Sequence, residues 1–209
     1  IAALLYSNPN NPSWICFTEK ELKIIAELAD RYNVVVLEDL DYVAMDFRKD
    51  LYHPGKPPYK ATAARYTDNY ILFISSSKAF SYAGQRIGLM IMSDKLYEKK
   101  CPDLRRFYTT DIFGRAMIFG TVYALSAGVT HSAQYAVAAM LKAANDNQFN
   151  FVDIVKEYGE KAKIMKKLFI DNSFYIVYDK DENDPIADGF YFTYAYPNRS
   201  EERRCRERV

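Results

Sequence analysis

Apolar residues in the first half of the chain occur in short continuous runs, a pattern typical of buried β-strands. Four such runs stand out, at residues 1–6, 34–37, 70–74 and 87–92. Between the first two, Thr18 and Glu21 form a capping box, and apolar residues then recur at helical spacing to about Tyr32. This order predicts two parallel strands joined by a right-handed crossover through a helix. The link between the last two runs is too short for such a crossover, so the fourth strand is predicted to be antiparallel to the third.

The second half of the chain changes to a helical spacing of its apolar residues. The pattern predicts three helices followed by two strands, at residues 111–127, 133–144, 149–172, 174–178 and 190–196. Ser132 is the expected N-cap of the second helix, which leaves His131 in the turn before it. We therefore expect an α/β fold, in which part of a doubly wound, mostly parallel sheet is followed by the start of a small α+β domain.

Composition narrows the classes of function. The 209 residues carry a net charge of +1, which gives no reason to expect a nucleic acid or an acidic membrane as a partner. The three cysteines show no CxxC spacing, which suits a reducing compartment and argues against a metal site. No apolar run approaches the roughly 18 residues of a membrane span, and no signal peptide is recognisable. We expect a cytoplasmic protein without a metal.

Polar side chains follow each of the first three predicted strands. Asn11 comes after the first, Asp39 and Tyr42 after the second, and Ser75 and Lys78 after the third. Parallel strands place their carboxyl ends at one edge of the sheet, where open α/β sheets bind their ligands. This convergence favours a binding site. Taken alone, Lys78 has the simpler interpretation of an exposed loop lysine, and Asp39 that of an N-cap or a solvated acid.

The neighbours of Lys78 suit a phosphorylated carbonyl compound. A partly desolvated lysine can act as a nucleophile and form a Schiff base with a carbonyl. The hydroxyls of Ser75 and Ser77 and the guanidinium of Arg86 suit a phosphate group. A lysine, a carbonyl and a phosphate together point to pyridoxal phosphate as the cofactor.

Three motifs, in this order, resemble those of the class I/II aminotransferases, which belong to the fold-type I enzymes that use pyridoxal phosphate. The motifs are Asn-Pro-Asn-Asn-Pro at residues 8–12, Asp39-x-x-Tyr42, and Ser75-x-x-Lys78 with Arg86 eight residues further on. The resemblance covers the chain from Ile1 to about Pro197. One departure is visible, because family members usually continue Asn-Pro-Thr-Gly where residues 13–14 are Ser-Trp. We expect this change to reshape the loop and to leave Asn11 in place.

The resemblance implies a role for each motif. Lys78 would carry the cofactor as a Schiff base and shuttle the proton at the substrate Cα. Asp39 would pair with the pyridinium nitrogen, and Asn11 and Tyr42 would hydrogen-bond the phenolic oxygen of the cofactor and favour its anion. The serine and the arginine of the third motif would hold the phosphate.

The same resemblance implies an activity and its partners. We expect transfer of an amino group from an amino acid to a 2-oxo acid by a homodimer. The alternatives are a carbon–sulfur lyase or related synthase that uses the same cofactor, and a ligand-sensing domain of a transcription regulator. The substrate is not predictable, since the arginine that binds its carboxylate is expected outside this chain. The 209 residues alone are expected to be inactive.

Three segments divide the chain under this interpretation. Residues 1–147 would form the second half of the cofactor-binding large domain, and residues 148–197 the start of the C-terminal small domain. Residues 198–209 are rich in arginine and lack apolar periodicity. We expect this tail to be foreign to the fold, for example translated out of frame, or alternatively a native solvated tail.

Overall fold

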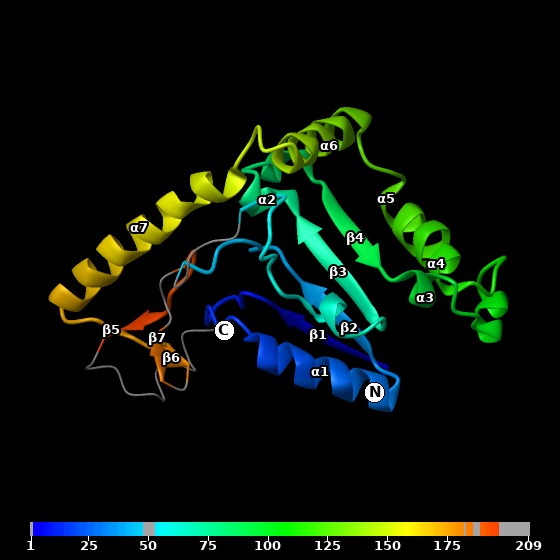
Figure 1. Cartoon of the computed structure of the whole chain (residues 1–209), viewed down its shortest axis with the longest axis horizontal. Coiled ribbons are helices and arrows are strands. Elements are labelled where there is room, and N and C mark those ends of the chain that lie inside the picture. The colour runs from blue at the N-terminus through cyan, green and yellow to red at the C-terminus, as the bar shows by residue number, and fades with distance from the viewer. Residues whose placement is uncertain (1, 48–52, 182, 186–188, 197–209) are drawn as a thin grey trace.

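A four-stranded sheet is the centre of the computed structural model, which describes residues 2–47, 53–181, 183–185 and 189–196 (Figure 1). Its strands are β1 (Ala3–Ser7), β2 (Val35–Asp39), β3 (Tyr70–Ser75) and β4 (Gly88–Met92), and they lie in that order. The first three are parallel, and β4 is antiparallel to β3. The predicted α/β fold and the predicted strand directions are confirmed. The expected tail at 198–209 lies outside the described residues.

Helix α1 (Glu19–Tyr32) joins β1 to β2 and has local sequence signals at both ends. The Thr18 hydroxyl accepts from the Glu21 backbone N–H at 3.3 Å, and the Glu21 carboxylate accepts from the Thr18 N–H at 2.7 Å. Asn33 ends the helix in the left-handed conformation, with φ 50°. The buried face of α1 packs Ala29 against Val36 of β2. The predicted capping box is therefore present.

The register of the strands places their carboxyl ends side by side. Ser7 of β1 pairs with Asp39 of β2, and Asp39 pairs with Phe73 of β3. Between β2 and β3, the described residues include the 3₁₀ turn η1 (Ala63–Arg65). The chain leaves β3 directly into the short helix α2 (Ser76–Ala79) and the 3₁₀ turn η2 (Ala83–Gln85). The ends of three strands thus open onto one edge of the sheet.

The region after β4 differs in part from the expectation of one regular helix over residues 111–127. It begins with α3 (Asp94–Tyr97) and the 3₁₀ turn η3 (Pro102–Arg106). A continuous helical segment then runs through α4 (Phe113–Arg115), η4 (Ala116–Tyr123) and α5 (Ala124–Ser126), and its middle part η4 is a π-helix. The ring of Tyr108 lies against Gly120, where an added Cβ would stand 2.2 Å from it. Apolar spacing indicated the helix but not its wider hydrogen bonding.

Helix α6 (His131–Asn145) begins two residues earlier than predicted. Its N-cap is Thr130, whose side chain makes no capping hydrogen bond, so the prediction of Ser132 as the cap is wrong. The first turn forms through the Gln134 backbone N–H, which donates to the Thr130 carbonyl at 3.2 Å. His131 is consequently the first helical residue and not part of a turn.

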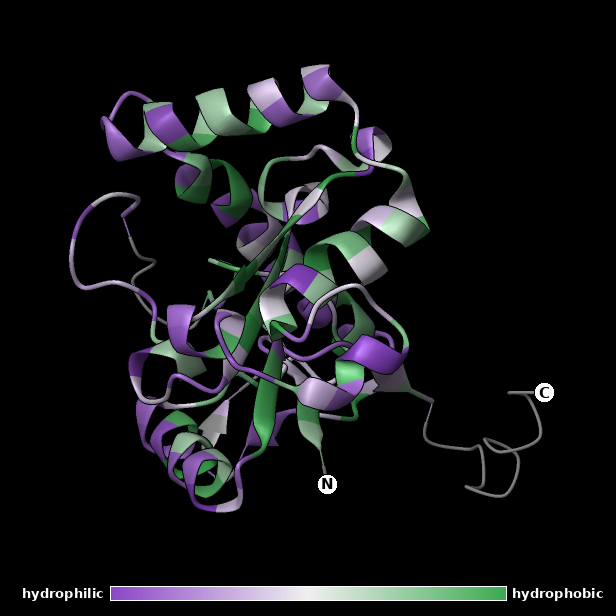
Figure 2. Cartoon of the chain, turned by 90° about the vertical axis from the view of Figure 1, so that its right-hand side faces the viewer, coloured by the Kyte–Doolittle hydropathy of each residue, from purple (hydrophilic) through white to green (hydrophobic). Residues whose placement is uncertain are grey.

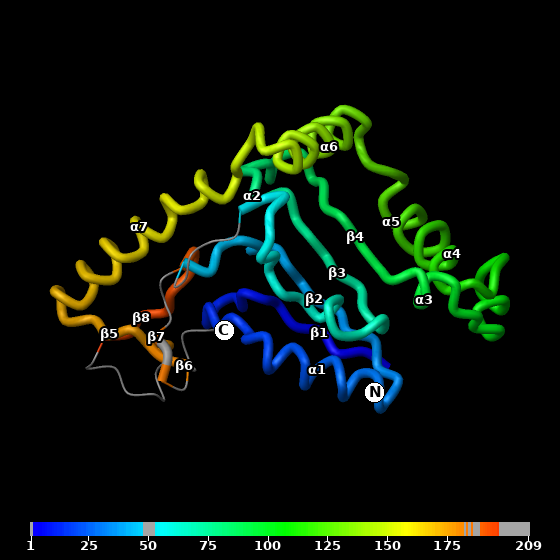
Figure 3. Tube along the Cα trace, viewed as in Figure 1, coloured from blue at the N-terminus to red at the C-terminus, as the bar shows by residue number. Residues whose placement is uncertain are grey.

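Helix α7 (Phe151–Asp171) carries the chain away from the sheet and towards two small hairpin-like pairs (Figure 3). The pairs are β5 (Tyr175–Ile176) with β8 (Tyr194–Ala195), and β6 (Lys180–Asp181) with β7 (Asp184–Pro185). The strands predicted at 174–178 and 190–196 are thus shorter than expected. The division into domains at residues 147 and 197 stays a prediction.

Hydrophobic residues follow the strands through the middle of the molecule, and the helices around them are mixed (Figure 2). A second apolar cluster lies beyond the strand ends, where Trp14, Tyr42 and Met45 pack against Val155 of α7. Among the described residues, none of the helices combines the length and the apolar character that crossing a membrane requires. The second cluster matters for function because it borders the carboxyl edge of the sheet.

Candidate active site

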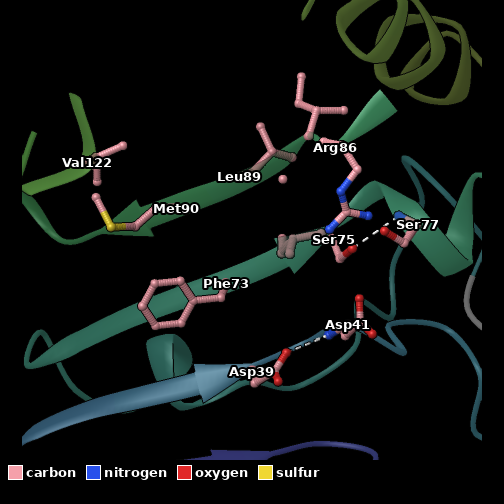
Figure 4. A pocket seen from close by; sticks show the side chains of 12 residues that line it. Asp39, Asp41, Phe73, Ser75, Ser77, Arg86, Leu89, Met90 and Val122 are labelled. Atoms are coloured by element: carbon pink, nitrogen blue, oxygen red, sulfur yellow. Dashed lines mark hydrogen bonds between the residues drawn. The ribbon is translucent and has the colours of Figure 1, made fainter. Parts of the chain in front are cut away.

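A cavity of about 500 Å³ opens at the carboxyl edge of the sheet (Figure 4). It is lined by side chains from β2, β3, β4 and the segments that follow them: Asp39, Asp41, Phe73, Ile74, Ser75, Ser77, Arg86, Ile87, Gly88, Leu89, Met90 and Val122. Four of the residues singled out from the sequence therefore line one cavity, namely Asp39, Ser75, Ser77 and Arg86.

The polar groups of the cavity are fixed by the way each strand ends. Asp39 is the last residue of β2, and its carboxylate accepts from the Asp41 backbone N–H at 3.0 Å. Ser75 is the last residue of β3, and its hydroxyl accepts from the Ser77 N–H at 3.1 Å as the N-cap of α2. Asp39 makes an Asx-turn, and Ser75 makes the corresponding serine turn, each with the backbone two residues further on. These turns fix the two side chains at the cavity.

Arg86 reaches the cavity from an unusual backbone conformation. It follows η2 with φ 51°, in the left-handed region, and its guanidinium donates to the Ala83 carbonyl at 2.9 Å. Figure 4 shows the guanidinium beside Ser75, with Asp39 further along the cavity. The side chain is exposed, which leaves other guanidinium N–H groups able to bind an anion.

The chemistry of these donors and acceptors fits a flat ring with a phosphate at one end. A guanidinium and two serine hydroxyls gather at one end, the Asp39 carboxylate stands at the other, and the Asp41 carboxylate also lines the cavity. Phe73 and Ile74 add apolar surface to the lining of the cavity. A phosphate suits the first end, and a protonated ring nitrogen suits the Asp39 carboxylate. The residues present therefore fit pyridoxal phosphate.

Asn11 and Tyr42 lie outside this cavity and contact each other. The Asn11 side-chain amide donates to the Tyr42 hydroxyl at 3.4 Å, and the Tyr42 hydroxyl donates to that of Tyr191 at 3.1 Å. Tyr42 is 5% exposed. Burial raises the pKa of Tyr42 above its usual range, and the hydrogen bond and the proximity of Tyr191 raise it further. Tyr42 is therefore a neutral hydroxyl that can both donate and accept.

Lys78 does not line the cavity with the other predicted residues. It lies in α2, and its Nζ stands 5.5 Å from the centroid of the Phe190 ring. The Phe190 ring in turn lies 5.9 Å from the ring of Tyr42. A cation over an aromatic face at this distance is attracted to the ring. The lysine is thus held on the side of the site where Tyr42 lies.

The loop that departs from the family pattern keeps Asn11 within reach of Tyr42. Trp14 has φ 62°, a conformation that favours glycine, and its side chain is fully buried. Its ring packs against Tyr42 with centroids 5.3 Å apart. The Ser13 hydroxyl donates to the Asn10 side-chain oxygen at 2.7 Å. Packing of the indole against the site offsets the strain of the backbone at this position.

Sequence reasoning missed several residues that border the site. Asp41 has a local signal, because it lies in the same acidic stretch as Asp39. Phe190 and Tyr191 have none, since Tyr191 is separated from its partner Tyr42 by 149 positions. Trp14 was noted only as a departure from the motif. Residues that meet through long-range packing leave no periodic or spacing pattern.

Comparison with known proteins matches these observations. The profile of the family described as aminotransferase class I and II matches residues 1–180. A protein named "Probable aspartate aminotransferase" from Methanocaldococcus jannaschii is 26% identical over 187 residues, which cover 86% of this chain and 44% of the relative. The chain therefore spans less than half the length of this relative.

Solved structures show the same fold. An aspartate aminotransferase variant from Thermus thermophilus superposes with a TM-score of 0.60 at 17% identity, over 84% of this chain and 39% of that one. An aromatic aminotransferase from Pyrococcus horikoshii gives a TM-score of 0.58 at 20% identity, over 86% and 42%. The fold, the order of the strand-end motifs and the match over residues 1–180 lead to one conclusion. The chain belongs to the class I and II aminotransferases.

Proposed function

We propose that the complete protein transfers an amino group from an amino acid to a 2-oxo acid with pyridoxal phosphate as its cofactor. The observation that carries the proposal is the gathering of Asp39, Ser75 and Arg86 around one cavity at the strand ends. Lys78 follows Ser75 by three residues, in the helix that Ser75 caps. Membership of the family supports the same function.

Four residues that line the cavity have a task toward the cofactor in this proposal. Arg86, Ser75 and Ser77 would hold the phosphate, and Asp39 would accept a hydrogen bond from the ring nitrogen and keep it protonated. The bound cofactor would supply an electron sink for the charge that develops at the substrate Cα.

The remaining residues act on protons. Tyr42 and Asn11 would present their donors to the ring oxygen. The Lys78 amine would anchor the cofactor and then, once displaced by the substrate, take a proton from the substrate Cα and return one. An amino acid and a 2-oxo acid as substrates, a homodimer as the working form, and a cytoplasmic location are part of the same proposal.

Labelling tests the role of Lys78. The complete protein is incubated with pyridoxal phosphate, reduced with borohydride, and digested to map the modified peptide. We expect the label on Lys78 and none in the Lys78→Ala variant. Lys95→Ala is a matched control, because Lys95 is an exposed lysine whose Nζ lies 3.8 Å from an Asp68 oxygen, away from the cavity. A label on another lysine with Lys78 unmodified would contradict the assignment.

Turnover with a panel of amino acids and 2-oxoglutarate tests the reaction itself. We expect glutamate and the matching oxo acid. Lys78→Ala should lower the rate by roughly 10²–10⁴-fold or more, since that is the usual contribution of a general acid–base group. Release of ammonia, sulfide or carbon dioxide without an oxo acid would show a lyase or decarboxylase instead.

A further inference from the structure

Tyr191 joins the C-terminal part of the chain to the candidate active site. Its hydroxyl lies 3.1 Å from the hydroxyl of Tyr42, and the two rings meet edge to face with centroids 5.4 Å apart. Trp14 packs against both rings, at 5.3 Å from Tyr42 and 6.1 Å from Tyr191. The neighbouring Phe190 contacts Tyr42 and lies under the Lys78 amine. Tyr191 is thus packed among residues of the site while it has no place in the roles proposed above.

The hydroxyl of Tyr42 has one proton and two lone pairs. In the structure one lone pair accepts from Asn11, and the proton goes to Tyr191. To donate to a ligand oxygen, Tyr42 must turn its proton away from Tyr191. Leaving a buried hydroxyl without its hydrogen-bond partner costs free energy, unless that partner can change from acceptor to donor. Tyr191 can do so, because a phenol both donates and accepts.

We infer that Tyr191 is a positioning residue, which reverses its hydrogen bond to Tyr42 so that Tyr42 donates its proton to the ring oxygen of the bound cofactor. The inference rests on the proposed function. Phenylalanine at position 191 would keep the ring in the aromatic cluster and remove only the hydroxyl. Tyr42 would then lose the donor that polarises it, and a hydroxyl that no longer accepts such a bond is a weaker donor.

A weaker donor at the ring oxygen has a measurable consequence. A hydrogen bond to this oxygen stabilises its anion, and the anion then holds the proton of the lysine–cofactor linkage less strongly. Tyr191→Phe is therefore expected to raise the pKa of the linkage by about 0.3–1 unit, on the scale of one modest hydrogen bond. The same variant should weaken cofactor binding by roughly 2–10-fold.

The experiment titrates the absorbance of the complete protein with bound pyridoxal phosphate against pH, and measures the dissociation constant of the cofactor. The variants are Tyr191→Phe, Tyr42→Phe and the double variant. Tyr194→Phe is the matched control, since it removes a hydroxyl from the nearby strand β8, where the ring stacks on Phe169 with centroids 4.0 Å apart. We expect Tyr191→Phe to shift the pKa of the linkage and the dissociation constant of the cofactor, and Tyr194→Phe to leave both unchanged. In the background of Tyr42→Phe, the change at position 191 should have no further effect on either quantity.

The possible outcomes distinguish a failure of the inference about Tyr191 from a failure of the proposed function. If the wild type forms the lysine-linked chromophore and Tyr191→Phe titrates like it, the inference is wrong and the proposed function stands. An equal shift from Tyr191→Phe with and without the Tyr42 hydroxyl would show a structural effect of Tyr191 and would also overturn the inference. If the wild type forms no chromophore at all, the proposed function itself fails.

Discussion

Glu38 and Asp39 are neighbours on β2 whose side chains point to opposite faces of the sheet, as strand geometry requires. Asp39 lines the cavity, whereas Glu38 is fully buried. The Glu38 carboxylate accepts from the Ala63 N–H at 2.7 Å and from the Asn8 side-chain amide at 3.2 Å. Burial raises the pKa of Glu38, against the opposing effects of these two hydrogen bonds and of the Lys60 charge. One carboxylate lines the cavity, and the other ties together segments that support the sheet edge.

The raised pKa of Glu38 predicts a pH dependence of stability. The folded state holds the Glu38 proton more tightly than the unfolded chain, whose pKa is about 4.3. The associated stability is fully present below that value and is lost as the pH rises through the folded pKa. Glu38→Gln cannot ionise, so its free energy of unfolding should fall less than that of the wild type as the pH rises from 4 to 8. Urea denaturation of the complete protein at several pH values measures the difference.

Glu98→Gln supplies the control, because Glu98 is exposed on the molecule. Its pH profile should match the wild type. Equal pH slopes for the wild type and Glu38→Gln would show that the burial of Glu38 carries no penalty on ionisation.

Whether the place of a single residue can be predicted depends on whether its neighbours in space are also close to it in the sequence. Asp39, Ser75 and Arg86 were found because a strand end and a fixed spacing in the sequence place them together. The direction of the Lys78 side chain was not predictable, since it depends on Phe190, which comes more than a hundred positions later. The link between Tyr42 and Tyr191 escapes sequence reasoning for the same reason.

At the scale of the element, α1 shows what local signals can do. Its capping box satisfies backbone groups that the first turn leaves free, and its sequence predicted it. The sequence pattern predicted neither the start of α6, which has no side-chain cap, nor the π-helical part η4. The two-residue strands β5 and β8 pair with each other, and among the described residues with no other strand. These features depend on tertiary packing, and the local sequence does not encode them.

The caps of α1 and α6 give a paired prediction. Thr18→Ala removes the hydroxyl that accepts from the Glu21 N–H, and should lower the free energy of unfolding by about 0.5–2 kcal/mol. Ser132→Ala should cost nothing measurable, because Ser132 lies inside the first turn of α6 and is not its cap. Urea denaturation of both variants of the complete protein tests this. A larger loss from Ser132→Ala than from Thr18→Ala would show that the caps are wrongly assigned.

At the scale of the molecule, the sheet has two open edges among the described residues. β1 pairs with β2 alone, and β4 with β3 alone. Leu4 and Leu5 of β1 are 43% and 67% exposed, and Ile24 and Leu28 of α1 are exposed nearby. An apolar edge strand with free backbone groups can pair with a second chain. The relative from Methanocaldococcus jannaschii is more than twice as long as the matched region.

We therefore predict that residues 1–209, expressed alone, self-associate and do not catalyse amino transfer, since catalysis requires the site to be positioned within about an ångström. Leu5→Lys adds a charge to the open edge and should raise the concentration at which the chain associates, because lysine on an edge strand opposes pairing. Tyr59→Lys is the control: Tyr59 is 62% exposed but lies outside the strands. Analytical ultracentrifugation over a range of concentrations measures the association, and the panel assay measures turnover against the complete protein. A monodisperse chain that turns over at a comparable rate would contradict the prediction.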